Sequence, residues 1–178
     1  MNPHPYQGLD PDTLIGAVES LGYLADGRLL ALNSYENRVY QIGIEEAAPL
    51  VGKIYRPQRW SDAAIAEEHR FALALAAAEI PVVPPLVDAS GHSLLRHRGF
   101  RFALYPRQGG RSPELEALEN LRWLGRFLGR IHQLGAARLF EHRPTLSPEL
   151  LGNQAAAFVL QGDNLPLDYE RRYRDLTE

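Results

Sequence analysis

Hydrophobic positions recur along this chain with two different periods, and the first segment has the period of a helix. Asp10 and Pro11 suit the N-cap and the first position of a helix, and Gly22 is placed to end it. Between them the apolar residues lie at helical spacing: Leu14, Ile15, Val18 and Leu21. The chain is therefore expected to open with a short amphipathic helix.

The next part of the chain, up to Tyr55, has the period of strands. Three apolar runs occur there, at 29–32, 38–42 and 50–55. Polar or glycine-containing segments separate them, at 33–37 and 43–49. Three sequential runs with short connections predict three antiparallel strands.

A second helix is predicted from Asp62 to Ala78, with Ser61 as its N-cap and Ile80-Pro81 beyond its end. Two more strand-like runs follow, at 93–96 and 100–105, joined by a turn at 97–99. We expect these runs to extend the first three strands to a single antiparallel sheet of about five.

Beyond this sheet the pattern becomes helical. Ser112-Pro113-Glu114 predicts the start of a long helix that runs to Gly135, with leucines on one face and a solvated or salt-bridged arginine stripe on another. Ser147-Pro148 predicts a further helix, Asp163, Asn164 and Pro166 predict its end, and 167–178 predicts a charged helix. The expected fold class is α+β, with a sheet-containing part at 1–105, a connecting segment at 106–111 and a helical part at 112–178.

Composition narrows the class of protein. With 45% hydrophobic and 23% charged residues, the chain of 178 residues is typical of a soluble globular protein. A net charge of -3 argues against a nucleic-acid binder, and the absence of cysteine excludes disulfides, thiolate metal sites and cysteine nucleophiles. No signal peptide or membrane span is evident. We expect a cytoplasmic protein with neither nucleic acid nor membrane as a partner.

One cation is unusual. Of nineteen Lys and Arg residues, Lys53 is the single lysine. An ammonium is a compact charge suited to phosphate oxygens, whereas guanidinium is a planar fork. Lys53 is therefore the first candidate for chemistry; the alternative is a lysine on a strand edge that discourages edge-to-edge pairing.

A carboxylate on the second predicted helix is the candidate partner of Lys53. Glu68 shares a helical face with Ile65, Ala72 and Leu75. A carboxylate on an apolar face is costly unless it meets a cation. We expect Glu68 to meet Lys53; the alternative is that Glu67 points inward and Glu68 reaches water.

The order of these features is that of kinase-like nucleotide sites: a lone lysine on a third strand, a helix presenting glutamate, a fifth strand and then helices. The turn between the first two strands would then lie over the phosphates. It contains Ser34, Tyr35, Glu36 and Asn37 and no glycine. Ser34, Asn37 and backbone amides could donate to phosphate, or the segment could be an ordinary hairpin turn.

Several segments carry a resemblance to a known family. They are 32–41, 53–60, 67–73, 109–111 and 128–133. In this order they resemble the bacterial stress response kinase A family, in the aminoglycoside phosphotransferase and choline kinase branch of the protein-kinase-like fold. The resemblance runs from about Asp10 to the C-terminus. It implies a kinase-like N-terminal lobe, ATP- and Mg-dependent phosphorylation of protein Ser or Thr, and a role in stress response.

The resemblance also implies roles for individual residues. Lys53 would bind phosphates with Glu68 as its partner, and Ser34, Tyr35, Glu36 and Asn37 would form the phosphate-covering loop. Tyr105, Pro106 and Gln108 would belong to a hinge that reads adenine through backbone groups. Pro106 has no N–H and offers only its carbonyl, while Gln108 offers an N–H. A plain linker is the alternative reading, and it does not exclude the first.

The catalytic motifs of the family are missing from these residues. The family uses a His-Gly-Asp-x-His-x-x-Asn loop and an Asp-x-Asp turn for the catalytic aspartate and the metal ligands. Neither occurs in the sequence, and we expect Gln161-Gly162-Asp163-Asn164 to be a loop between helices. We therefore expect the N-terminal part of a longer kinase, with its catalytic aspartate beyond Glu178, that does not transfer phosphate by itself.

Other readings stay open at this point. A small-molecule kinase for an aminoglycoside, choline or homoserine-like acceptor would use the same lobe. A non-catalytic interaction or nucleotide-binding fragment is the third reading. The six histidines lack zinc-site spacing, and neither a Gly-x-Ser-x-Gly elbow nor a Walker lysine loop is present, which argues against hydrolase and P-loop functions.

Overall fold

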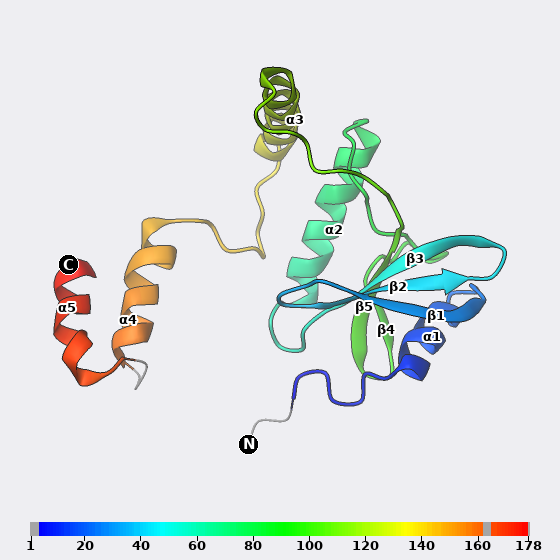
Figure 1. The fold of residues 1–178 in the computed structure, drawn as a ribbon, viewed down its shortest axis with the longest axis horizontal. Coiled ribbons are helices and arrows are strands. Elements are labelled where there is room, and N and C mark those ends of the chain that lie inside the picture. Colours follow the sequence, from blue (N-terminus) through cyan, green and yellow to red (C-terminus); the bar gives the residue numbers. More distant parts are fainter. Residues whose placement is uncertain (1–3, 162–164, 178) are drawn as a thin grey trace. The chain divides into compact units, whose positions relative to one another are not determined.

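The computed structural model describes residues 4–161 and 165–177, which form two compact units, Met1–His142 and Arg143–Glu178. The first unit contains one sheet and three helices (Figure 1). Its elements in chain order are α1 (Pro11–Glu19), β1 (Ala25–Leu32), β2 (Arg38–Ile44), β3 (Ala47–Ile54), α2 (Asp62–Ala77), β4 (Leu95–His97), β5 (Phe100–Pro106) and α3 (Leu118–Ala136).

The five strands form one antiparallel sheet in the order β1-β2-β3-β5-β4. The predicted five-stranded antiparallel sheet is thus confirmed. Lys53 lies on β3, opposite Val39 of β2 and Ala103 of β5. Because β3 is the middle strand, the alternative that Lys53 protects a sheet edge is wrong.

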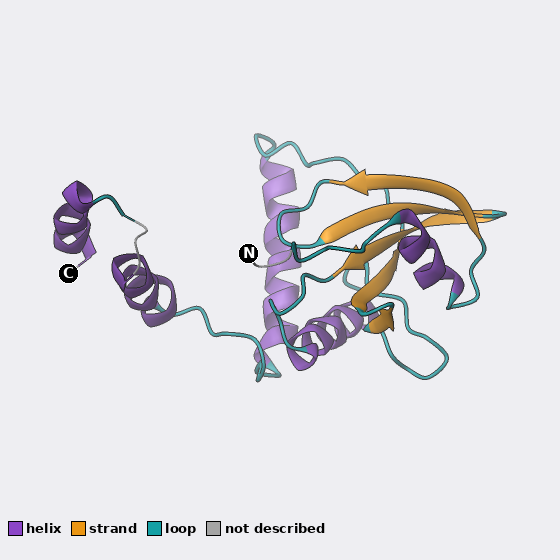
Figure 2. Cartoon of the chain, turned by 90° about the horizontal axis from the view of Figure 1, so that it is seen from below, coloured by secondary structure: helices purple, strands orange, loops and turns teal. Residues whose placement is uncertain are grey.

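The two faces of the sheet are covered by different helices. On one face Leu14 and Val18 of α1 pack into a core with residues from β2, β3 and β5: Ile42, Ile44, Leu50, Ile54, Phe102 and Leu104. Figure 2 shows α1 lying across the strands on this face. Successive strand residues point to opposite faces, so Ala103 faces the other way, where it packs with Ile65 of α2. Lys53 shares the Ala103 face.

The first two helices begin at the capping residues that the sequence indicates. Asp10 accepts a hydrogen bond from the Thr13 amide at 2.7 Å, and Ser61 accepts one from the Ala64 amide at 3.1 Å. These bonds satisfy amides that have no partner inside the helix. The caps therefore fix where α1 and α2 start, and α2 carries Glu68.

Two predicted boundaries are wrong. The third helix begins at Leu118 instead of Ser112-Pro113. The carbonyl of Glu114 accepts hydrogen bonds from Asn120 Nδ2 at 2.9 Å and from the Ala117 amide, and these bonds close a separate turn before the helix. The break predicted at 43–49 is only a two-residue turn, since Ile44 pairs directly with Ala47. Polar and glycine residues at an exposed hairpin end conceal the pairing from a hydrophobic pattern.

The second unit consists of short helices. Its elements are a single turn of π-helix (Glu149–Asn153), α4 (Gln154–Gln161) and α5 (Leu167–Thr177). The hydroxyl of Ser147 accepts from the Leu150 amide at 3.2 Å, which confirms a helix start near Ser147-Pro148. The predicted break at Asp163 and Asn164, and the predicted helix end at Glu178, lie outside the described residues. Across 4–161 and 165–177, no helix has the length and apolar character needed to cross a bilayer.

Candidate functional site

The predicted contact between Lys53 and Glu68 is present. Lys53 Nζ lies 3.2 Å from Glu68 Oε1, and the two side chains are 23% and 39% exposed. The same ammonium lies 4.8 Å from the centre of the Tyr55 ring, a distance suited to a cation–π contact. The lysine is thus held from two sides, yet it stays accessible to a ligand from solvent.

The buried glutamate of α2 is Glu67, which corrects the expectation that Glu68 occupies the apolar face. Glu67 is 9% exposed, and its carboxylate accepts the backbone amides of Glu141 at 2.6 Å and His142 at 3.0 Å. Neighbouring helix positions point about 100° apart, so Glu68 lies at the border of the buried face. From there it still reaches Lys53, and the two glutamates hold two different segments of the chain.

A buried histidine adjoins this pair, and sequence reasoning did not single it out. His69 is 1% exposed, with Nε2 2.6 Å from the Tyr55 hydroxyl and Nδ1 2.8 Å from Ser93 Oγ. The Tyr105 hydroxyl lies 3.4 Å from Nε2 and 3.3 Å from the Tyr55 hydroxyl. Burial, and then the charge of Lys53, lower the pKa of His69 to about 4. A neutral ring therefore joins α2 to β5 and to the chain after β3.

This histidine predicts a pH dependence of stability. The folded pKa of about 4 lies below the ordinary value of 6.5, so the unfolded chain takes up the proton first as pH falls. The contribution of the neutral ring to the free energy of unfolding is fully present above about pH 6.5. As the pH falls from about 6.5 to about 4, the free energy of unfolding decreases by roughly 3 kcal/mol. Urea unfolding across this range measures the loss. In His69→Gln the free energy of unfolding should change much less with pH over this range. An unchanged pH dependence would contradict the assignment of this effect to His69.

The loop between β1 and β2 is tied to the chain that follows β3. Ser34 Oγ donates to the Asn37 carbonyl at 2.8 Å, and Asn37 Oδ1 accepts the Arg56 amide at 3.2 Å. Glu36 accepts hydrogen bonds from Arg59 and Trp60. Tyr35 is fully exposed. The four predicted loop residues thus form a turn between β1 and β2 that is hydrogen-bonded to the segment after β3.

The predicted hinge residues differ in their surroundings. Tyr105 and Pro106 still belong to β5, opposite Val51 and Leu50 of β3. The Tyr105 hydroxyl joins the buried histidine cluster, and burial raises the pKa of Tyr105. Pro106 and Gln108 are exposed at and beyond the strand end. The use of their backbone groups by adenine stays a prediction.

The sheet register adds an apolar surface around the lysine that the sequence pattern did not reveal. Val39 and Ala103 are the direct cross-strand neighbours of Lys53, and Val51 precedes it by two positions on the same face. Strand alternation could have indicated these residues once the pairing was known. Val39 and Val51 are half-buried whereas Ala103 is fully buried beneath α2, so the two valines supply the apolar surface next to the ammonium.

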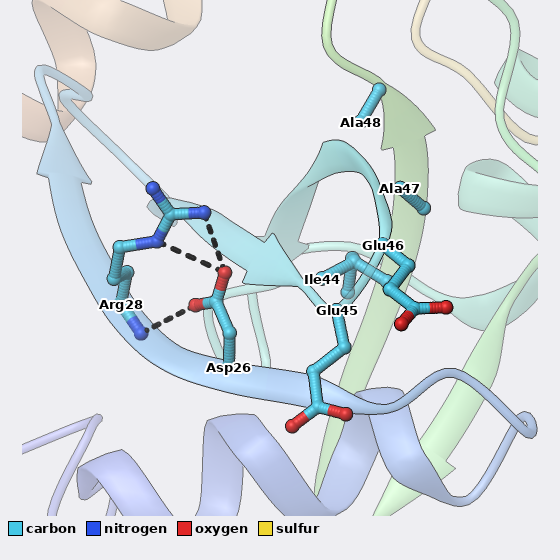
Figure 3. A pocket seen from close by; sticks show the side chains of 7 residues that line it. All are labelled: Asp26, Arg28, Ile44, Glu45, Glu46, Ala47 and Ala48. Carbon is cyan, nitrogen blue, oxygen red and sulfur yellow. Dashed lines mark hydrogen bonds and ion pairs between the residues drawn. The ribbon is translucent and has the colours of Figure 1, made fainter.

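An open hollow of about 680 Å³ lies elsewhere in the sheet, around the β2–β3 turn (Figure 3). Its polar lining contains three carboxylates, Asp26, Glu45 and Glu46, and one guanidinium, Arg28, which is bonded to Asp26. Such a surface repels phosphate. It lies at the opposite end of β3 from Lys53 and contributes nothing to the lysine site.

No metal centre can be assembled from the described part of the chain. Within 4–161 and 165–177 no three His, Asp or Glu side chains gather closely enough to hold an ion. A Mg²⁺ ion bound by one or two carboxylates and by substrate phosphates needs no such cluster, so the position of the metal ligands stays a prediction.

Comparison with protein families gives a match over most of the chain. The model of a phosphotransferase enzyme family matches residues 28–177. Stress response kinase A of Shigella flexneri is 48% identical over 79% of this chain and 43% of its own length, as is the protein of that name in Escherichia coli strain K12. Serine/threonine protein kinase RdoA of Salmonella typhimurium is 44% identical over 82% of this chain and 44% of its own length. The chain thus spans less than half the length of these relatives.

Solved structures share the fold. Amicoumacin kinase hAmiN in complex with AMP-PNP, Ca²⁺ and Ami superimposes with a TM-score of 0.69 at 19% identity, over 94% of this chain and 52% of its own. A microcompartment-associated aminopropanol kinase gives a TM-score of 0.61 at 16% identity, over 84% and 54%. At these identities the likeness concerns the fold alone, and it confirms the expected α+β kinase-like class.

Proposed function

We propose that this chain, which belongs to the phosphotransferase enzyme family, is the nucleotide-binding part of an ATP-dependent kinase. The observation that carries the proposal is the Lys53–Glu68 ion pair, formed between the middle strand and the facing helix at 3.2 Å. A lysine held by a helix glutamate is the arrangement that kinases use to bind the α- and β-phosphates. Family membership and this geometry point to the same chemistry.

The charges near Lys53 suit an anionic ligand. Glu68 orients the ammonium without burying it, since the lysine side chain keeps 23% of its surface exposed. Burial keeps His69 neutral near pH 7, so the cation is not pushed away by a second positive charge behind it. In the proposal Lys53 binds phosphate oxygens and the Ser34–Asn37 loop covers them.

In the proposal the adenine lies on the surface beside the lysine. Val39 and Val51 share the face of Lys53 and are half-buried, and an apolar surface is suited to the flat face of a purine. In the proposal the backbone of Tyr105, Pro106 and Gln108 reads the adenine edge, with the Pro106 carbonyl as acceptor and the Gln108 N–H as donor. The apolar contacts to the adenine face and the hydrogen bonds to the adenine edge would then lie on the same side of the phosphate site.

The remaining catalytic parts are assigned to the rest of the protein. The described residues form no cluster of three His, Asp or Glu side chains, and the chain spans only 43–44% of the length of its sequence relatives. We propose that Mg²⁺ and the catalytic aspartate are held outside this chain, and that the chain alone binds ATP without transferring phosphate.

The proposed acceptor is a Ser or Thr hydroxyl of a cytoplasmic protein, in a stress response. It is supported by the names of the sequence relatives, stress response kinase A and serine/threonine protein kinase RdoA. A small-molecule acceptor is the second candidate, because the structural neighbours are named as amicoumacin and aminopropanol kinases. A phosphorylation assay of the whole kinase with protein and amine-alcohol acceptors separates the two.

A binding measurement on this chain tests the nucleotide assignment. Glu68→Gln keeps the size of the side chain but removes the charge that orients Lys53, so we expect ATP affinity to fall about tenfold. Isothermal titration calorimetry measures the change. Glu45→Gln, at an exposed glutamate of the β2–β3 turn, should bind like the unsubstituted chain. If the unsubstituted chain does not bind ATP at all, the non-catalytic module becomes the better reading.

A further inference from the structure

The β1–β2 loop is held in place from outside, although it contains no glycine to give it a special conformation. Glu36 contributes three of the contacts. Its carboxylate accepts Arg59 Nε at 2.7 Å and Trp60 Nε1 at 2.8 Å, and its backbone carbonyl accepts the Tyr6 hydroxyl at 2.7 Å. All three donors lie more than twenty residues away in the sequence, and two of them, Arg59 and Trp60, are on the chain that leads from β3 to α2.

The donors themselves are fixed. The Arg59 guanidinium lies 4.9 Å from the centre of the Trp60 ring, which holds the two groups side by side. The Trp60 carbonyl accepts a hydrogen bond from Arg101 Nη1 of β5 at 2.7 Å. Asn37, the next residue of the loop, accepts the Arg56 amide. The loop is thus attached to a connection that is itself anchored in the sheet.

This connection also joins the two elements that carry the ion pair. It starts one residue after β3, which carries Lys53, and ends at α2, which carries Glu68. The loop is therefore bonded to the segment that lies between the two charged residues in the sequence. A carboxylate so engaged is a poor candidate for contact with phosphate, because its own charge repels the ligand.

We propose that Glu36 is a positioning residue that holds the Ser34–Asn37 loop over the phosphates of ATP. A glycine-rich loop reaches the phosphates through its flexibility, whereas this loop is held near them by side-chain contacts. The inference rests on the proposed nucleotide function and deepens it. Glu36 acts through the loop: its carboxylate fastens the turn to Arg59 and Trp60, and the loop contacts the ligand.

The pKa of Glu36 agrees with this role. Burial by itself raises it, but the hydrogen bonds from Arg59 and Trp60 outweigh that effect and hold the pKa below its ordinary value. The carboxylate is therefore charged near pH 7, and the bonds it accepts are of the stronger, charge-assisted kind.

Tryptophan fluorescence and two ligands test the inference. The chain has two tryptophans, so Trp123→Phe leaves Trp60 as the reporter. In that background Glu36→Gln should increase acrylamide quenching of Trp60, and calorimetry should show ATP affinity falling about tenfold with adenosine affinity unchanged, because the loop contacts only phosphates. Glu45→Gln is the matched control and should change neither quantity.

The outcomes separate the inference from the function on which it rests. Greater quenching with selective loss of ATP affinity supports the positioning role. Equal loss for ATP and adenosine, or no change in either, overturns the role while the nucleotide function stands. If the unsubstituted chain binds neither ligand, the proposed function fails, and the role of Glu36 fails with it.

Discussion

Replacement of Lys53 by alanine is expected to lower the affinity for ATP about a hundredfold. The change removes the one lysine of the chain and leaves Glu68, whose carboxylate then faces the phosphates without a cation. Hydrogen bonds to charged groups contribute about 1.5–3 kcal/mol, so the loss of the contacts between the ammonium and the phosphates sets the size of the effect. Isothermal titration calorimetry with ATP measures the loss.

Two further variants make this result specific. Lys53→Arg keeps the charge but replaces a compact ammonium by a planar fork, and should bind ATP about tenfold more weakly than the unsubstituted chain. Arg28→Ala removes an equal charge from the opposite end of the sheet, where Arg28 is bonded to Asp26, and should not change the affinity. If Lys53→Ala binds ATP as tightly as Arg28→Ala does, the lysine is not a phosphate ligand.

Replacement of Glu67 by alanine is expected to lower the free energy of unfolding by about 3 kcal/mol. The substitution removes a buried carboxylate and leaves the amides of Glu141 and His142 without the oxygens that they contact at 2.6 and 3.0 Å. Hydrogen bonds to a charged group contribute about 1.5–3 kcal/mol each, and because the two amides belong to exposed residues that water can reach, the lower end of this range sets the size of the effect. Urea unfolding monitored by circular dichroism measures it.

The neighbouring residue is the control for this prediction. Glu68 is 39% exposed, and its ion pair with Lys53 lies partly in solvent. Such pairs contribute less than about 1 kcal/mol to stability. Glu68→Gln should therefore unfold at nearly the same urea concentration as the unsubstituted chain while it loses ATP affinity. Glu67→Ala should lose stability, and its ATP affinity should change less than that of Glu68→Gln. Equal loss of stability in the two variants would contradict the distinction.

The sheet and the first two helices could be predicted because local signals agreed with each other. Asp10 and Ser61 are strong caps, and alternating apolar runs marked each strand. The start of α3 could not be predicted, since the Asn120 side chain binds the Glu114 carbonyl and closes off the first turn. A side chain that competes for a backbone group leaves no trace in a hydrophobic pattern.

The site was predicted in outline and missed in detail. A lone lysine and a helix glutamate were enough to propose the ion pair, because a carboxylate near an apolar face needs a cation. The roles of Glu67 and His69 depend on partners at 141–142 and at Ser93. Contacts between residues so distant in the sequence are set by tertiary packing and carry no local signal.

The most direct measurement of the central claim uses the amine of Lys53 itself. Because the chain has one lysine, an amine-reactive reagent can modify only Lys53 and the N-terminal amine, and mass spectrometry distinguishes the two. Saturating ATP is predicted to slow modification of Lys53 at least about tenfold, as its phosphates cover the ammonium, while adenosine and the N-terminal rate serve as controls. An unchanged rate at Lys53 in the presence of bound ATP would contradict the account.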